Sequence, residues 1–413
     1  MPRRRVPLLL AASLALASCA ARVPARSGAP ASVADDEQAI LAESRDLDRR
    51  IEESDLAHHD DALEDYLTGV ARRLVATEDP GAAPSVRVRV LRIAEPNAFA
   101  LPHGTVWVHV GMLACMDDEA QLATVLGHEL AHVTHRHALR QARELASQEA
   151  WASVAQTVVG TLALLAYAQT GRVGPAASAA QQTKVLWLAA AVSGYSRDLE
   201  READESGFRA LRAAGYDARD GAVVFERLKE ATGDADEGAL FFATHPRLDE
   251  RLASYRALAA AGSRPAPASG AGEADAAPRS GSASANAGAF RDAVAPVLLE
   301  DALLEMSGGR IDVARAAVAR HLAWRSESAR GYLVLGQVAR ASGRDPGHVG
   351  DALAAYKRAA RLDPELAEPH REIGFLLREQ GRDAEARAAF ERYLALAPGA
   401  ADAPLVRGLV SHP

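Results

Sequence analysis

The hydrophobic and polar positions of this chain predict a mainly helical protein with one short β-rich segment. Between residues 40 and 76, apolar side chains recur at the spacing of one helical face. They are Ile51, Leu56, Leu63, Leu67 and Val70. The stretches 85–90 and 105–110 instead alternate apolar and polar residues, as half-buried strands do. We therefore expect helices and, after them, two strands of a small sheet.

A further amphipathic helix is predicted directly after the second strand. Asp117, Asp118 and Glu119 suit a helix N-terminus, because carboxylates there cap free backbone N–H groups and complement the helix dipole. The apolar positions that follow are expected to face the core: Leu122, Val125, Leu126, Leu130 and Val133. The same helix contains a dense run of histidines, GHELAHVTHRH, at residues 127–137.

Two more apolar stretches, 151–168 and 185–192, raise the question of a membrane hairpin. A transmembrane helix needs about 20 consecutive apolar residues. The first stretch is shorter and contains Ser153, Gln156, Thr157 and Thr161. We favour buried or membrane-touching helices and keep an integral membrane hairpin as the alternative.

The C-terminal third contains a repeat. Residues 262–289 have almost no large apolar side chain, which predicts a disordered linker before it. Residues 351–364 then align with 385–398 at an offset of 34, and Gly336 aligns with Gly374 at an offset of 38. The aligned positions include Ala352, Tyr356 and Pro364 with Ala386, Phe390 and Pro398. Residues 290–413 thus resemble tetratricopeptide repeats, stacked helix pairs that usually bind proteins. The alternative is an array that only supports the first domain.

The N-terminus has the pattern of a targeting signal. Three arginines precede an apolar run that is too short for an ordinary membrane span. The run ends in Leu16-Ala17-Ser18-Cys19, which resembles the lipobox of bacterial lipoproteins. This resemblance implies a signal peptide at 1–18, a lipid on Cys19 and a tether at 19–38. Ala20 implies sorting to the outer membrane, facing the periplasm. An ordinary secretory signal is the alternative.

Charge and cysteine content narrow the function classes. The chain has 47 Lys and Arg against 55 Asp and Glu, a net charge of −8, which does not suggest a nucleic-acid partner. Cys115 is the only cysteine other than Cys19, so the processed chain would have no internal disulfide.

The histidine run contains the motif His-Glu-x-x-His. His128 and His132 are four residues apart, so on a helix both imidazoles lie on one face and can bind one metal ion. Glu129 between them can take a proton from a bound water. The motif predicts a zinc site with one Zn²⁺ per chain. The alternative is a scaffold whose metal site is silent or structural, although such a site would not need Glu129.

Zinc needs a third protein ligand if one position is to stay open for water. The longer metzincin motif would require Gly at 135 and His at 138, but the chain has His135 and Ala138. A glutamate from a later helix is the other option, and residues 196–204 contain one. Glu200 can bind the metal, while Asp204, one turn later, can hydrogen-bond a liganding imidazole.

Four segments of the chain resemble segments of one family, and they occur in the same order as in that family. They are 97–113, 118–137, 196–204 and 244–251. The family is the zinc peptidases that include the HtpX heat-shock protease and the CAAX prenyl protease. The layout is closest to the periplasmic β-barrel assembly-enhancing protease. The resemblance implies a zincin-like (gluzincin) metallopeptidase domain at 39–261, followed by the α-helical repeat domain.

The family pattern implies roles for individual residues. His128, His132 and Glu200 would bind zinc, Glu129 would act as general base, and Asp204 would support a ligand. Asn97 and the strand containing Thr105, Val106, Trp107 and Val108 would pair with an extended substrate.

The segment 244–251 adds two residues. His245 matches a histidine that can occupy the open metal position and hold the enzyme inactive. The alternative is a helix-capping or packing role for His245. Arg251 matches an arginine placed to stabilise the oxyanion. His135 and His137 have no role in the family's metal site and are expected to be structural, as is Glu202.

Together these features predict a lipid-anchored zinc endopeptidase at the outer membrane. Its substrates would be unfolded or misassembled envelope proteins, and its helical repeats would contact an outer-membrane assembly machine. The competing hypothesis is a non-enzymatic chaperone or scaffold lipoprotein.

Overall fold

The computed structural model describes residues 33–77, 86–146, 195–232, 248–262, 280–343 and 346–411. Four predictions lie outside these residues: the signal peptide, the lipid site at Cys19, His245 and the apolar stretches 151–168 and 185–192. Within the described ranges, no helix combines the length and the apolar character that crossing a membrane requires.

A four-stranded sheet lies near the N-terminal end of the fold. Its strands are β1 (Ala57–His58), β2 (Arg87–Leu91), β3 (Ala98–Ala100) and β4 (Thr105–His109), in the order β1-β2-β4-β3. β2 pairs with β4 in parallel, whereas β1 and β3 are antiparallel to their neighbours. The two strands predicted from alternation are confirmed. The other two are too short for a pattern of period two to be recognised.

The sheet order contradicts the predicted substrate strand. Thr105, Val106, Trp107 and Val108 belong to β4, whose two sides are already paired with β2 and β3. A peptide cannot add to a strand whose backbone N–H and C=O groups are paired on both sides. Asn97 directly precedes β3, which lies beside β4 at an edge of the sheet formed by the described residues.

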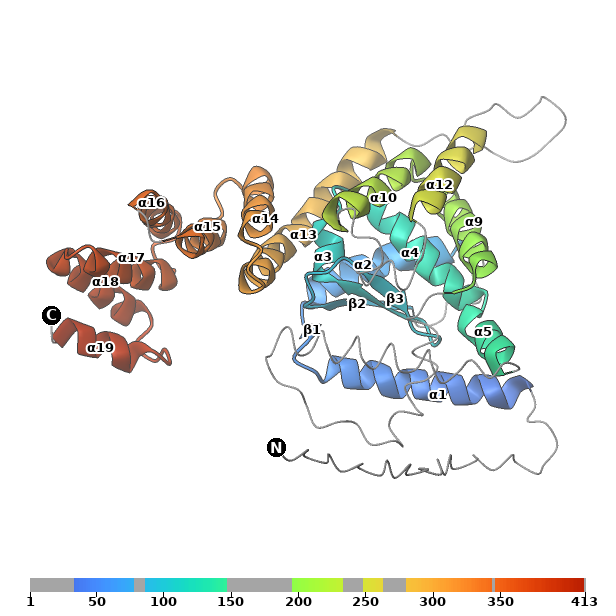
Figure 1. The fold of residues 1–413 in the computed structure, drawn as a ribbon, viewed down its shortest axis with the longest axis horizontal. Coiled ribbons are helices and arrows are strands. Elements are labelled where there is room, and N and C mark those ends of the chain that lie inside the picture. The colour runs from blue at the N-terminus through green and yellow to red at the C-terminus, as the bar shows by residue number, and fades with distance from the viewer. Residues whose placement is uncertain are drawn as a thin grey trace, which may run out of the picture.

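Helices cover both faces of the sheet (Figure 1). α1 (Val33–Glu52) runs along one face, and α2 (Asp61–Val75) and α4 (Glu119–Thr134) lie over the other. Successive side chains of β2 and β4 point to opposite faces of the sheet, so each face has apolar side chains for a helix layer to cover. Val88 and Val106 pack in the main core with Leu67 of α2, whereas Trp107 packs with Leu47 of α1 in a second cluster. The sheet is thus the middle of three layers.

A polar network fixes α1 to the sheet. Asp48 accepts hydrogen bonds from the Trp107 indole at 2.8 Å and the Thr105 hydroxyl at 3.0 Å. The His103 ring lies 3.1 Å from the same carboxylate and 2.5 Å from the Ser44 hydroxyl. The helical pattern expected over 40–76 is not one continuous helix, because β1 separates α1 from α2.

His109 at the end of β4 gives the fold a pH dependence. Its ring is buried, with Nδ1 2.8 Å from the Glu95 carbonyl oxygen. Burial lowers the pKa of His109 to about 4, against 6.5 for an exposed histidine, and the hydrogen bond to Glu95 offsets only part of this. The unfolded chain therefore binds a proton between pH 6.5 and 4 that the folded chain does not. We expect the unfolding free energy to fall by about 3 kcal/mol over that window.

Urea unfolding of the metal-free protein at several pH values checks this expectation. His109→Asn keeps a donor near the Nδ1 position but does not titrate. Its unfolding free energy should depend on pH less steeply than that of the wild type. Parallel curves for the two proteins would contradict the assignment to His109.

Five more helices belong to the described part of the N-terminal region, and three of them pack against α4. They are α3 (Val110–Ala114), α5 (His137–Ala146), α9 (Arg197–Ala213), α10 (Ala218–Thr232) and α12 (Leu248–Gly262). α9 and α10 both pack against α4, and α12 packs against both of them. Phe208, Phe225 and Tyr255 from these three helices join the main core.

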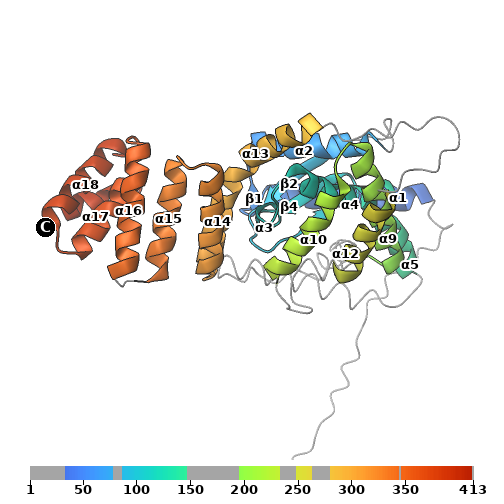
Figure 2. The ribbon, with the colours of Figure 1, turned by 90° about the horizontal axis from the view of Figure 1, so that it is seen from above.

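The C-terminal part is a row of paired helices (Figure 2). They are α13 (Ser280–Ser307), α14 (Ile311–Trp324), α15 (Ala329–Ser342), α16 (Pro346–Leu362), α17 (Glu368–Glu379), α18 (Asp383–Leu396) and α19 (Ala403–Ser411). A Cβ on Gly336 would lie 2.4 Å from the Tyr356 ring, and one on Gly374 would lie 2.5 Å from Phe390. These are the aligned positions of the repeat, so the pattern reflects one close helix contact used twice.

The first helix of this row also belongs to the N-terminal core. Phe290, Val294 and Val297 of α13 pack in the same cluster as α2 and α4. In addition, the Arg320 guanidinium on α14 donates to the backbone carbonyls of Ala114, the last residue of α3, and of Met116. The row is therefore attached to the sheet-containing part through packed side chains and hydrogen bonds.

Two predicted boundaries are wrong. α1 begins at Val33, inside the expected tether 19–38, and α13 begins at Ser280, inside the expected linker 262–289. Both segments contain several alanines, and alanine favours a helix even where no large apolar side chain is present to pack. A lack of large apolar residues therefore did not exclude helix.

Candidate metal centre

The motif helix α4 begins where the capping residues predicted it. The Asp118 side chain accepts a hydrogen bond from the Gln121 backbone N–H at 2.9 Å, as an N-cap residue does. The predicted inward positions Leu122, Leu126 and Leu130 are buried. His128 and His132 follow one turn apart on this helix, and both are buried.

α9 crosses α4 at two glycines. A Cβ on Gly207 would lie 2.8 Å from the Gly127 carbonyl carbon and 2.9 Å from the His128 backbone nitrogen. Side chains at this crossing would hold the helices apart, so two glycines are needed for the close approach. The crossing brings Glu200, two turns before Gly207 on α9, to the face of α4 that carries the two histidines.

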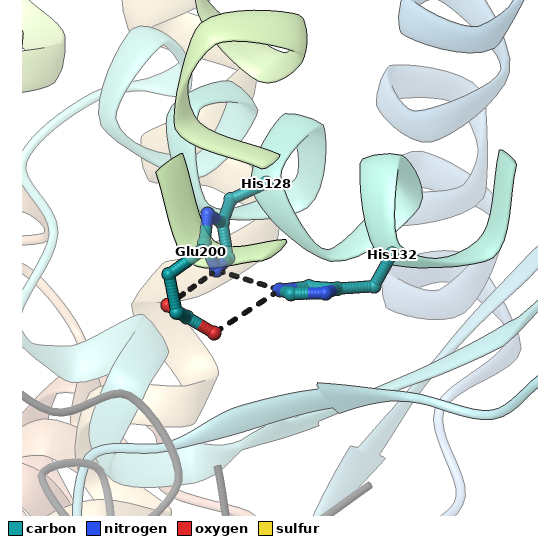
Figure 3. Close-up of side chains that lie close together, drawn as sticks. All are labelled: His128, His132 and Glu200. Carbon is teal, nitrogen blue, oxygen red and sulfur yellow. Dashed lines mark hydrogen bonds and ion pairs between the residues drawn. The ribbon is translucent and has the colours of Figure 1, made fainter. Parts of the chain in front are cut away.

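Three potential ligand atoms meet at this crossing (Figure 3). Nε2 of His128 lies 3.0 Å from Nε2 of His132. The two carboxylate oxygens of Glu200 each lie 3.5 Å from one of these nitrogens. All three side chains are buried. The structure thus brings together the three residues predicted as metal ligands.

The spacing fits zinc. Nitrogen and oxygen ligands at about 2.0–2.2 Å from a tetrahedral zinc ion lie about 3.3–3.5 Å apart. The observed separations of 3.0 and 3.5 Å fall close to this range. Two imidazoles and a carboxylate also form a donor set typical of catalytic zinc, with the fourth position left for water or substrate.

Glu129 lies on the turn of α4 that carries the ligands, and it is 2% exposed. Burial and the negative charges of Glu129 and Glu200 raise the pKa of the Tyr195 hydroxyl. The Tyr195 ring stacks on His132 with centroids 4.0 Å apart. Tyr195 therefore packs against the centre, although no sequence motif pointed to it.

Asp204 contacts His128 on the side of the imidazole that faces away from the other two ligands. Its Oδ1 lies 2.9 Å from Nδ1 of His128, so Nδ1–H can donate to it while Nε2 faces the other two ligands. Arg251 lies 2.8 Å from the same oxygen. Burial would raise the pKa of Asp204, but the charge of Arg251 and the bond to His128 outweigh it and hold that pKa well below its usual range.

The position of Arg251 does not fit the expected oxyanion role. The guanidinium is buried and reaches Asp204 and Nδ1 of His128, the nitrogen that points away from the other two ligands. An oxyanion forms beside the metal and needs donors about 3 Å from its own position. Arg251 instead anchors Asp204.

Removing the charge of Asp204 should weaken metal binding. In Asp204→Asn the hydrogen bond to His128 loses its anionic acceptor and Arg251 loses its partner. We expect zinc affinity to fall by roughly 10–100-fold. Competition with a chromophoric chelator measures this. Asp198→Asn, which changes an exposed carboxylate on the same helix, should bind zinc like the wild type. Equal affinity in both variants would contradict the supporting role of Asp204.

Sequence comparison places this site in a known family. Residues 61–259 match peptidase family M48. The beta-barrel assembly-enhancing protease of Escherichia coli K12 is 29% identical over 199 residues, 48% of this chain and 39% of that protein. The mitochondrial metalloendopeptidase OMA1 of Schizosaccharomyces pombe is 30% identical over 187 residues, 45% of this chain and 50% of that protein.

The chain thus spans no more than half the length of these two relatives. Among solved structures, the MamA protein covers 32% of this chain at 20% identity and a TM-score of 0.24. The family match includes the histidine motif, the crossing helix α9 and the strands β2, β3 and β4. Residues 61–259 of this chain are therefore a peptidase family M48 domain.

Proposed function

We propose that this chain is a zinc-dependent endopeptidase of the bacterial cell envelope that cleaves unfolded or misassembled proteins. The observation that carries the proposal is Glu129, a buried carboxylate placed between two histidines that converge with Glu200 in an M48 domain. A metal site that only stabilised the fold would not need this fourth side chain.

The side chains divide the work of peptide hydrolysis. Zinc, when bound by His128, His132 and Glu200, would polarise the peptide carbonyl and lower the pKa of a water to about 7. Glu129 would accept a proton from that water as it attacks the carbonyl carbon. It would then pass the proton to the leaving amine nitrogen as the peptide bond breaks.

β3 is the better candidate for substrate pairing. It is the edge strand nearest to α4 among the described strands, and it follows Asn97. An extended peptide added to this edge would be held by backbone hydrogen bonds, largely independent of its sequence. A folded protein does not offer a free extended segment, so this mode favours unfolded substrates.

His245 is proposed to regulate this site, on the resemblance of 244–251 alone. It would occupy the open metal position in the resting enzyme. Activity assays should therefore include His245→Ala, which removes the blocking side chain and should cleave at least as fast as the wild type.

The cell-envelope location rests on the N-terminal pattern and on the names of relatives. A lipid on Cys19 would hold the chain at the outer membrane, facing the periplasm. The helix pairs α13 to α19 would then bind substrates or an assembly machine for outer-membrane β-barrels. One relative is named for enhancing β-barrel assembly, which supports this direction.

Cleavage of an unfolded and a folded protein tests the proposal. We expect residues 20–413 with His245→Ala to degrade casein and to leave a tightly folded protein such as ubiquitin intact. A chelator should stop the reaction. Chelator-sensitive cleavage of both proteins would contradict the edge-strand mode. No cleavage of either protein, with zinc bound at one per chain, would favour the scaffold hypothesis.

A further inference from the structure

The two liganding histidines are supported differently. Nδ1 of His128 faces a carboxylate, Asp204, which is paired with Arg251. Nδ1 of His132 instead lies 2.8 Å from Nδ1 of another imidazole, that of His137. His137 is completely buried. The sequence pattern suggested only a structural role for it.

A short turn between two helices places His137 there. α4 ends at Thr134 and α5 begins at His137, so only two residues connect the helices. Arg136 has a φ of 54°, a left-handed conformation that is unfavourable for a residue other than glycine. The turn puts the His137 ring edge-on to the His132 ring, with centroids 4.8 Å apart.

Metal binding by His132 determines which ring nitrogens of His132 and His137 donate a hydrogen bond and which accept one. A histidine that binds metal through Nε2 has its proton on Nδ1, and that proton needs an acceptor. Nδ1 of His137 lies 2.8 Å from Nδ1 of His132 and can serve as that acceptor. For Nδ1 of His137 to accept, its own proton must lie on Nε2. That nitrogen faces Glu202, with Oε2 at 3.5 Å.

Glu202 is itself held in place. Arg140, one turn beyond His137 on α5, donates to the same oxygen of Glu202 at 2.7 Å. The chain of contacts from His132 through His137 and Glu202 to Arg140 thus parallels the one from His128 through Asp204 to Arg251. Each liganding imidazole is backed by a carboxylate and an arginine, and on the His132 side an additional imidazole lies between.

We propose that His137 is a positioning residue for the metal ligand His132. Its Nδ1 accepts the Nδ1–H of His132, which leaves Nε2 of His132 as the metal-binding nitrogen, and the negative charge of Glu202, 3.5 Å from Nε2 of His137, favours the His137 tautomer with its proton on Nε2. The inference rests on the proposed metal centre and goes beyond it, because it gives a role to two residues outside the ligand set.

Two substitutions at one position separate hydrogen bonding from packing. His137→Phe keeps a ring in the buried site but has no acceptor. His137→Asn is smaller but can place its amide oxygen near the Nδ1 position. We expect His137→Phe to bind zinc roughly 10–100-fold more weakly than the wild type, and His137→Asn to recover most of that loss.

Chelator competition gives the zinc affinity, and the visible absorption of the cobalt-substituted protein reports the ligand geometry. His137→Phe should change the cobalt spectrum, while His137→Asn should resemble the wild type. His135→Leu is the matched control. It removes a neighbouring imidazole that contacts Ser206 and Glu202 and should leave the spectrum unchanged.

The outcomes are distinct. Wild-type affinity and spectrum in His137→Phe would overturn the inference and leave the proposed function intact, whereas failure of the wild type to bind zinc would overturn both. If His137→Phe does not fold, Glu202→Ala provides the test. The Glu202 side chain is 37% exposed, so its loss should be tolerated while zinc affinity still falls several-fold. Unchanged affinity in Glu202→Ala would then overturn the inference.

Discussion

Glu129→Gln is expected to abolish peptide cleavage while zinc stays bound. Glutamine has nearly the same shape as glutamate but cannot accept a proton from water, so the hydrolytic step loses its base. Because Glu129 is buried next to the ligands without being one of them, the metal site should remain. We expect kcat/KM for an unfolded substrate to fall by at least about 10²–10⁴-fold.

Zinc content measured on the same preparation completes this test. One zinc per chain in Glu129→Gln, together with lost cleavage, assigns the carboxylate to catalysis. Glu205→Gln on α9 is a suitable control, because this carboxylate is exposed and should be dispensable. Residual cleavage close to the wild-type rate would show that another group is the base.

Gly207→Ala is expected to damage the fold and the metal centre together. The added Cβ would lie within 3 Å of backbone atoms of Gly127 and His128, and backbone cannot turn aside as a flexible side chain can. α9 must therefore move away from α4, which carries Glu200 away from the two histidines. We expect a loss of about 1–3 kcal/mol in unfolding free energy and at least tenfold weaker zinc binding.

A glycine elsewhere provides the matched comparison. Gly69 lies within α2, and a Cβ there would meet only the end of the Arg73 side chain at 4.0 Å. Gly69→Ala should therefore stabilise the protein by about 0.5–1 kcal/mol and leave zinc binding unchanged. Thermal unfolding with and without zinc measures both effects. Equal behaviour of the two variants would refute the role assigned to the Gly127–Gly207 crossing.

Local patterns predicted much of the site. The spacing of His128 and His132, the cap at Asp118 and the spacing of Glu200 and Asp204 in a later helix are short-range features, because each joins residues within about one helical turn. The repeat also showed in the sequence, since Gly336 and Gly374 meet Tyr356 and Phe390 at aligned positions. A helical period and a repeat are both regular spacings, which a sequence displays directly.

Features set by the order of strands or by the packing of distant helices were not predicted. Alternation identified β4 as a strand but could not show that β2 and β3 occupy both its sides. Arg251 was expected beside the reacting carbonyl, yet α12 places it behind His128. His137 was expected to be structural, because the left-handed turn at Arg136 that aims it at His132 leaves no pattern in the sequence.

We propose that His128, His132 and Glu200 hold a zinc ion that is required for peptide hydrolysis. The most direct test is the rate of casein cleavage during zinc titration of the metal-free protein, with His245→Ala to avoid self-inhibition. We expect no cleavage without metal and a rate that rises linearly to a plateau at one zinc per chain. Cleavage that is the same with and without zinc would contradict the requirement for this metal centre.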